Sequence, residues 1–479
     1  MNGDGFAAGE LPTSNVGDTQ SDHSPGGHAC ETILSAFPTT LPESEVLSLS
    51  VANFVVPRGR DLLGRLERFA AWTNERERWG VEPFSKSTDT APRPECAVRD
   101  RSGRISIQGV NFASQDYLSL SSHPAIKAAA QAAIEQYGVH SAGSAALMGN
   151  TRLSIELERS LIQFTGYRQC TLFPTGWSAG YGIIRALITR RDYILIDRTA
   201  HACLQEGATN ATDNVIRFAH LSNGEVRQHL EEIRSKDMHT GILIVTESLF
   251  SMDSDCASLD ELQSTAREFG ATLLVDCAHD LGAMGPSGLG NMELQGQTKR
   301  IDVLIGSFSK TFASNGGFVA SNYPALHWHI RYTCNPHTFS NALSPVQCAT
   351  VLQALDIVRS EEGNERRKRL MRNSNYLREQ LSQADFQVLG DPSPIVPVLI
   401  GQMAYARVLT REVLRRGGIV NLVEFPAVAV RSSRYRLQVM ADHESRHIDR
   451  LVDILREART ATLSMMGAHI EPHEASASV

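Results

Sequence analysis

The stretch Ile301-Asp302-Val303-Leu304-Ile305-Gly306-Ser307-Phe308-Ser309-Lys310-Thr311 decides how this chain is interpreted. Its first half is an apolar run that ends in glycine and small hydroxyl residues, a pattern typical of a buried strand that leads into a turn. Lys310 would then lie at the carboxyl end of a strand, where α/β proteins build their binding sites. A desolvated amine there can form a Schiff base with a carbonyl group. A lone strand-terminal lysine is more often structural, so the prediction depends on the rest of the chain.

Four more apolar runs precede this stretch and alternate with helical patterns. This alternation predicts repeated βαβ units and a mainly parallel sheet. Because each run ends in a polar residue, the sequence also predicts a row of polar side chains at one edge of that sheet. The runs are residues 170–173, 193–196, 241–245 and 271–275.

The first of these runs leads into a turn that opens a helix, with Thr175, Gly176 and Trp177 at its start. Exposed N–H groups and the positive end of the helix dipole suit such a place to a phosphate group. An ordinary β–α turn explains the same pattern. His201 follows the second run and is placed to stack on a planar ring, although a lone histidine is more often a satisfied polar residue.

Asp276 and His279 follow the run 271–275. A carboxylate at the end of a buried strand needs a strong partner, because an unpaired buried charge is unfavourable. A pyridinium N–H would be such a partner, and His279 would reach the phenolic oxygen of the same ring. The alternative is an aspartate that caps the next helix. The ordered set, with Lys310 last, predicts one site for pyridoxal 5'-phosphate (PLP).

Composition limits the class of protein. The chain has 479 residues, a formal net charge of −7 and a pI near 6.2, which argues against nucleic-acid and anionic-membrane partners. No apolar stretch is long enough to span a bilayer and the N-terminus lacks a signal pattern, so we expect a cytoplasmic protein without a membrane span. Eight cysteines show no metal-ligand spacing, so no metal site is predicted.

The pattern divides the chain into five parts. Residues 1–45 are expected to be a disordered tail, because they are too polar to bury a core. The other expected parts are an N-terminal helical arm and hairpin at 46–110, a large PLP-binding domain at 111–345, a small α+β domain at 346–465 and a mobile tail at 466–479.

Finer elements are predicted inside the arm and the small domain. Apolar residues at helical spacing predict an amphipathic helix over 58–78, and residues 101–104 are predicted to form a hairpin turn. In the small domain we expect a long helical stretch after residue 345, strands at 395–400, 418–421 and 435–439, and a helix over 445–458.

An ordered set of motifs resembles the α-oxoamine synthases, the family that includes 8-amino-7-oxononanoate synthase, 2-amino-3-ketobutyrate CoA ligase and serine palmitoyltransferase. About three quarters of the chain takes part in this resemblance. The motifs are Asp116-Tyr117-Leu118, Gly176-Trp177, the stretch from Asp197 to Ala202, Glu247-Ser248-Leu249-Phe250-Ser251-Met252-Asp253, the stretch from Asp276 to His279, the stretch from Ser307 to Lys310, and Arg434-Tyr435-Arg436 followed by His443.

The resemblance implies the PLP fold type I, with a large seven-stranded sheet domain, a smaller C-terminal α+β domain and a homodimer whose active sites are shared. It implies that Lys310 holds PLP and moves protons at the substrate α-carbon, while Asp276 pairs with the ring nitrogen. The other implied contacts are His201 stacked on the ring, Ser251 and His279 at the ring oxygen, Thr175, Gly176, Trp177 and Ser307 at the phosphate, and Ser340 and Asn341 at the phosphate of the other subunit.

The implied reaction is the decarboxylative condensation of an α-amino acid with an acyl thioester, carried by coenzyme A or an acyl carrier protein, to give an α-amino ketone. Arg436 would hold the amino-acid carboxylate, because its fork binds a carboxylate at two points. An aminotransferase or carbon–carbon lyase of the same fold would use Lys310 and Asp276 alike. A noncatalytic partner subunit would be expected to lack the lysine.

Five positions depart from the family pattern. Gln115 stands where the family has Asn and is expected to meet the substrate, and Ser154 stands where a histidine is expected. The others are Cys277 in place of an acidic residue, Asp280 in place of a small residue, where it would add a charge near the ring, and Ala313 in place of Gly. These departures suggest a member from specialised metabolism and leave the amino acid and the acyl donor open.

Overall fold

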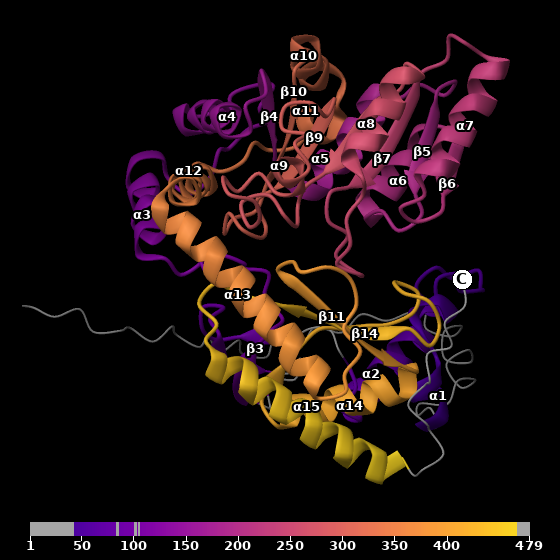
Figure 1. Cartoon of the computed structure of the whole chain (residues 1–479), viewed down its shortest axis with the longest axis vertical. Coiled ribbons are helices and arrows are strands. Elements are labelled where there is room, and N and C mark those ends of the chain that lie inside the picture. Colours follow the sequence, from indigo (N-terminus) through magenta and orange to yellow (C-terminus); the bar gives the residue numbers. More distant parts are fainter. Residues whose placement is uncertain (1–42, 83–85, 100–102, 104–105, 467–479) are drawn as a thin grey trace, which may run out of the picture.

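The computed structural model describes residues 43–82, 86–99, 103 and 106–466. Residues 1–42 of the tail expected over 1–45, most of the expected turn at 101–104 and residues 467–479 lie outside the described residues. The last three residues of that expected tail differ from the prediction, because they begin helix α1 (Glu43–Ser48). The rest forms a large part around a seven-stranded sheet and a smaller part that contains the C-terminal strands, with the long helix α13 (Glu361–Gln383) running along the smaller part (Figure 1).

The central sheet has the strand order β4-β10-β9-β8-β7-β5-β6 and is parallel except for β10, which is antiparallel to both of its neighbours. This arrangement confirms the predicted α/β fold. The sequence did not predict β6 or β10. The strands are β4 (Gln169–Phe173), β5 (Tyr193–Asp197), β6 (Val215–Phe218), β7 (Ile242–Glu247), β8 (Thr272–Asp276), β9 (Val303–Ser307) and β10 (Gly317–Ser321).

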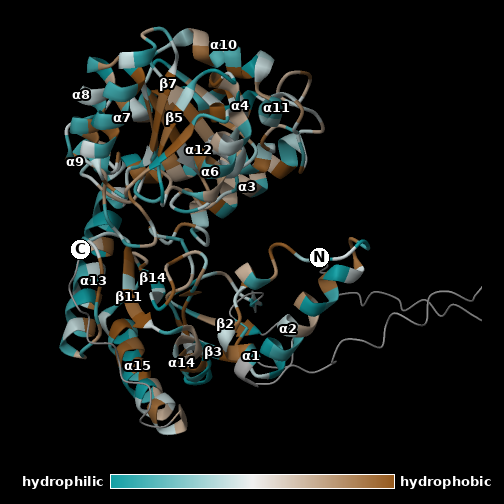
Figure 2. Ribbon diagram, turned by 90° about the vertical axis from the view of Figure 1, so that its right-hand side faces the viewer, coloured by the Kyte–Doolittle hydropathy of each residue, from teal (hydrophilic) through white to brown (hydrophobic). Residues whose placement is uncertain are grey.

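Helices cover both faces of this sheet. Successive strand residues point to opposite faces, so Ile244 packs in one apolar cluster while Leu243 and Val245 pack in the other. Figure 2 shows these apolar strands enclosed by helices whose outer residues are hydrophilic. On one face lie α5 (Gly176–Leu187), α6 (Ala202–Ala211) and α10 (Pro324–Thr333); on the other lie α4 (Arg152–Thr165), α7 (Asn223–Lys236), α8 (Leu259–Glu268) and α12 (Pro345–Arg359). The remaining helices of this part are α3 (Pro124–Tyr137), α9 (Asn291–Leu294) and α11 (Asn335–Thr338).

The smaller part contains two sheets. One is antiparallel in the order β11-β14-β13, with bounds Ile395–Gly401, Ser433–Gln438 and Leu422–Val423. The other joins β1 (Ser87–Thr88), β2 (Glu95–Arg99) and β3 (Ser106–Asn111) to β12 (Gly418–Ile419), so the N-terminal hairpin pairs with the C-terminal region. Helices α14 (Met403–Arg415) and α15 (Ser445–Met466) complete this part, and the helix predicted over 445–458 continues to Met466.

The N-terminal arm differs from its prediction. Helix α2 begins at Glu67 rather than near residue 58 and ends at Arg78, after the short helices α1 (Glu43–Ser48), η1 (Val51–Asn53) and η2 (Gly64–Leu66). Leu62 and Leu63, assigned to the apolar face, are 65% and 79% exposed. The apolar spacing was misleading because the chain bends at residues 59–61 and turns at 62–63 before the separate short helix η2 begins at Gly64.

A buried ionic cluster fastens the arm to the smaller part. The Glu424 carboxylate accepts from Arg76 Nη2 at 3.1 Å and from Arg407 Nε at 2.8 Å, and both guanidinium groups lie over the Trp72 ring. Loss of one partner would leave an uncompensated buried charge, which costs about 3–5 kcal/mol. Among the described residues, no helix is long and apolar enough to cross a membrane.

Candidate active site

The carboxyl ends of the central strands surround a cavity of about 230 Å³. Eight residues that the sequence assigned to one site line it together: Thr175, Gly176, Trp177, His201, Asp276, His279, Ser307 and Lys310. They come from the residues that follow β4, β5, β8 and β9, as expected for parallel strands whose carboxyl ends meet at one sheet edge. Cys203, Glu247, Ala278, Ile305 and Ser309 complete the lining.

One end of the cavity is the N-terminus of α5. Thr175 caps this helix, and its Oγ1 accepts from the Ser178 N–H at 3.0 Å. No described residue accepts from the N–H of Gly176 or Trp177, so both remain available to an anion. Gly176 is packed closely against Ser307, because a Cβ at residue 176 would lie 2.6 Å from Ser307 Oγ. This end fits a phosphate group.

The close approach of Gly176 to Ser307 yields a first prediction. Gly176→Ala forces a methyl group into this contact, and overpacking of this kind costs about 1–3 kcal/mol. We expect the dissociation constant for PLP to rise about 10-fold, measured by fluorescence titration of the cofactor-free protein. Gly224→Ala is the control, because a Cβ there meets nothing within 4 Å. Equal affinity in the two variants would contradict the assignment of this turn to the phosphate.

Asp276 and Lys310 face the same cavity from β8 and from the loop after β9. The Asp276 side chain is 8% exposed, and its Oδ1 accepts from the Ala278 N–H at 2.9 Å. Burial raises the pKa of Asp276, while the positive charge of Lys310 opposes this rise. Burial also lowers the pKa of the Lys310 amine, and no described residue hydrogen-bonds that amine. A buried carboxylate with one hydrogen bond and a desolvated amine fit the ring nitrogen and the aldehyde of PLP.

Two histidines flank these groups. His201 caps α6, and its Nδ1 accepts from the Cys203 N–H at 3.3 Å. Burial lowers the pKa of the imidazole of His201 and lowers that of His279 well below its ordinary value. His279 Nδ1 lies 2.9 Å from the Tyr117 hydroxyl. When that hydroxyl donates to Nδ1, the proton of neutral His279 is on Nε2, ready to donate to a ring oxygen.

Arg436 lies beside the cavity rather than in its lining. It extends from β14, and its Nη1 donates to Ser251 Oγ at 3.1 Å. Its Nε is buried and has no partner among the described residues. An orphaned guanidinium N–H this close to Lys310 fits a carboxylate ligand. Gln115 is half-buried, and no described residue hydrogen-bonds its side chain.

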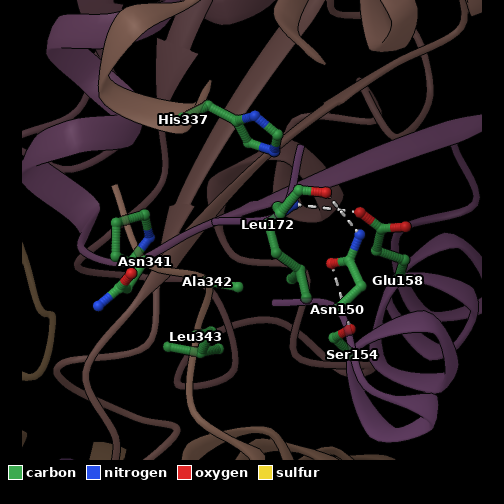
Figure 3. Close-up of a pocket in the computed structure, with 10 residues that line it drawn as sticks. Asn150, Ser154, Glu158, Leu172, His337, Asn341, Ala342 and Leu343 are labelled. Atoms are coloured by element: carbon green, nitrogen blue, oxygen red, sulfur yellow. Dashed lines mark hydrogen bonds between the residues drawn. The ribbon is translucent and has the colours of Figure 1, made fainter. Parts of the chain in front are cut away.

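Ser340 and Asn341 do not reach the cavity of their own chain. Asn341 is exposed and its Nδ2 lies 3.2 Å from His140 Nε2, while the Ala342 N–H donates to Gly143 O at 2.9 Å. Figure 3 shows Asn341, Ala342 and Leu343 passing a small pocket formed with Asn150, Ser154, Glu158 and His337. Ser154, found where a histidine was expected, completes a capping box with Thr151 at the start of α4.

The structure gives local reasons for other departures. Asp280 was expected to add a charge near the ring; it does not line the cavity, because its Oδ1 accepts from the Ser248 hydroxyl and its Oδ2 from the Asn291 N–H, each at 2.7 Å. Asp280 therefore holds the loop before α9 rather than lining the cavity. Cys277 is fully buried in the core. Ala313 has a φ of 53°, a left-handed conformation that explains why glycine is common there.

Sequence reasoning gave no role to three residues at the site. Glu247 is 5% exposed and its Oε1 accepts from the His201 N–H at 2.6 Å. Tyr117 holds His279, and Cys203 holds the His201 ring. A signal for Glu247 was present, because it ends an apolar strand just as Asp276 does. The contacts of Tyr117 and Cys203 had no comparable pattern.

Comparisons with known proteins show which family the chain is similar to. The family model for aminotransferase classes I and II matches residues 107–455. The chain is 35% identical to 8-amino-7-oxononanoate synthase of Geotalea daltonii, over 74% of this chain and 91% of that protein. It is 36% identical to serine palmitoyltransferase of Sphingobacterium spiritivorum, over 71% of this chain and 84% of that protein. A serine palmitoyltransferase structure from S. paucimobilis, with bound PLP and myriocin, superposes with a TM-score of 0.78 at 29% identity, covering 84% of this chain and 99% of that one.

Proposed function

This chain belongs to the α-oxoamine synthase family, whose PLP-dependent enzymes condense an amino acid with an acyl thioester and release carbon dioxide, and from this premise we propose how its own residues perform that reaction. The observation that carries the proposal is the convergence of Lys310, Asp276, His201 and His279 on one cavity with an anion-binding helix end.

We propose that Lys310 attaches the cofactor and then carries the proton to and from the substrate α-carbon. When bound, PLP withdraws electrons from that carbon, which makes loss of its proton feasible. Asp276 keeps the ring nitrogen protonated, His279 donates to the ring oxygen, and His201 covers the ring face. Gly176, Trp177, Thr175 and Ser307 hold the phosphate. The lowered pKa of Lys310 supports its role, because burial favours the neutral amine, which is the form that accepts a proton.

We propose that Arg436 binds the carboxylate of the amino acid. Arg436→Ala removes a charged hydrogen-bond donor worth about 1.5–3 kcal/mol, so the KM for the amino acid should rise about 10- to 100-fold. The KM for the thioester should change little. Arg436→Lys should recover part of the lost amino-acid affinity, because lysine keeps the positive charge but lacks the planar guanidinium group that binds a carboxylate at two points. The measurement is steady-state kinetics with each substrate varied in turn. Equal increases in both KM values would contradict the assignment.

We propose that the acyl chain enters a second cavity, of about 330 Å³, whose lining includes Ser114 and Asn421. Two of its walls adjoin the substrate residues, because Ser114 precedes Gln115 and the Asn421 carbonyl accepts from the Arg436 N–H at 3.0 Å. Pro92, Cys96, Val98, Ala113 and Ile419 give the cavity an apolar side suited to hydrocarbon.

Narrowing this second cavity should affect only one substrate. Val98→Trp fills part of the apolar side, and each methylene group kept out of such a site loses about 0.8 kcal/mol. We expect the KM for a long-chain acyl thioester to rise about 10-fold or more, with unchanged α-proton exchange of the amino acid. Gln108→Trp, at an exposed position of neighbouring β3, is the control. An equal effect of the two variants would argue against this cavity.

We propose a homodimer in which Ser340 and Asn341 reach the phosphate of the partner's cofactor. The support is that these residues stand apart from their own cavity, on a segment paired with residues 143–144. Val139, Leu147, Met148 and Phe339 are exposed apolar side chains on the same two segments, as expected for a surface that a second subunit covers.

The alternative of an aminotransferase is tested by the first half of the reaction. The protein should exchange the α-proton of its amino acid into deuterated water without any thioester, and should form a product only after a thioester is added. A screen of amino acids by mass spectrometry identifies the substrate. Formation of a keto acid in the absence of thioester would favour the aminotransferase.

A further inference from the structure

Glu247 is a second buried carboxyl group in the cofactor cavity, and the reaction described above does not use it. It ends β7, and the strand register places it beside Asp276 at the end of β8. Adjacent strands lie about 4.8 Å apart. The two carboxyl groups thus enter one cavity from neighbouring positions, and both side chains are less than a tenth exposed.

Two carboxylates this close and this buried cannot both be charged without a large electrostatic penalty. The charged groups that act on Glu247 are Asp276, Lys310, Asp197 at the end of β5 and Arg436 on β14, and the two cations oppose its protonation. Asp276 is favoured to hold the charge, because Lys310 and His201 both stabilise its carboxylate. Burial, followed by the charge of Asp276, raises the pKa of Glu247 well above its ordinary value, and the hydrogen bond from the His201 N–H opposes this only in part.

Glu247 also fixes His201. Its Oε1 accepts from the His201 N–H at 2.6 Å, while the imidazole Nδ1 is held by the Cys203 N–H and lies 3.1 Å from the Cys203 thiol. The backbone of His201 is thus tied to β7 and its ring to the first turn of α6. Together these contacts fix the position of the His201 imidazole in the cavity that Asp276 also lines.

We propose that Glu247 is a positioning residue that acts as an uncharged carboxylic acid: it holds His201 over the cofactor ring and leaves Asp276 as the one carboxylate that pairs with the ring nitrogen. This inference rests on the proposed function, because it assumes that PLP binds in this cavity. Its two physical claims, a protonated acid and a hydrogen bond that fixes His201, are testable without turnover.

The test compares Glu247→Gln with Glu247→Leu. Glutamine has the shape of the protonated acid and its amide oxygen accepts from the His201 N–H, so the dissociation constant for PLP should stay within about twofold of the original value, with an unchanged visible spectrum from pH 6 to 9. Leucine leaves the His201 N–H without a partner, so PLP should bind about 10- to 100-fold more weakly with a shifted spectrum. Glu206→Gln, at an exposed position of α6 outside the cavity lining, is the control and should resemble the original protein.

Infrared spectroscopy of the cofactor-free protein gives an independent reading. At neutral pH the C=O stretch of a protonated carboxylic acid should be weaker in Glu247→Gln than in the original protein, so the difference spectrum of the two should contain this band; the pKa of Glu158 is also raised, to about 7, and its contribution cancels in the difference. Loss of PLP affinity in Glu247→Gln comparable to that in Glu247→Leu, or no infrared difference, would overturn the uncharged acid. Affinity retained in both variants would overturn the positioning role. Neither result depends on whether the enzyme forms a carbon–carbon bond, so failure here is distinct from failure of the proposed function.

Discussion

Lys310→Ala is expected to abolish amino-ketone formation and to slow α-proton exchange of the amino acid by at least about 1000-fold, because both the covalent attachment and the proton carrier are lost. The structure supports this size of effect, since no other lysine in the described part of the chain lines the cavity. The exchange is measured by incubating protein and amino acid in deuterated water, quenching at set times, and determining the deuterium content of the recovered amino acid by mass spectrometry.

Added methylamine should restore part of the exchange in Lys310→Ala, because a small amine can occupy the space of the missing side chain and accept the proton. Lys127→Ala, at an exposed position of α3, is the matched control and should keep full activity. Exchange at the normal rate in Lys310→Ala would mean that another base acts on the α-carbon.

Asp276→Asn is expected to slow α-proton exchange by at least about 100-fold while PLP stays bound. Asparagine is nearly the same size, so the cavity keeps its shape, but it cannot hold the ring nitrogen in the protonated state that draws electrons from the substrate. Exchange rate and PLP content are measured on the same sample, which separates lost chemistry from lost cofactor.

Asp280→Asn is the matched control for this substitution. Asp280 is equally buried and four residues away, yet its carboxylate bonds Ser248 and Asn291 rather than facing the cavity. The Asp280→Asn substitution should lower the melting temperature of the protein with little effect on the α-proton exchange rate per bound cofactor. Equal effects of Asp276→Asn and Asp280→Asn on exchange would contradict the pairing of Asp276 with the ring.

The sequence predicts the site well where a residue's place follows from strand order. Lys310 and Asp276 each end an apolar run, and parallel strands bring such ends together whatever the loops do. The antiparallel strand β10 was missed. It follows the loop that contains Lys310 and pairs with β9 and β4, and this pairing depends on tertiary contacts rather than on the periodicity of its sequence. The helix predicted from residue 58 failed because apolar spacing alone cannot detect turns.

The parts of the site that escaped prediction depend on contacts between distant segments. Glu247 matters because its oxygen meets the backbone of a residue 46 positions earlier. The direction of the Asp280 carboxylate is set by the N–H of Asn291, the first residue of the short helix α9. Residue type gives no direction to a side chain, so the charge of Asp280 was expected near a ring that it does not face.

The most direct test of the account is carbon dioxide release from an amino acid labelled at its carboxyl carbon, with and without an acyl thioester. The account predicts no labelled carbon dioxide from the amino acid alone, and release in equal amount to the α-amino ketone once thioester is added. Release without thioester, or turnover to a keto acid that retains the label, would contradict a decarboxylative condensation.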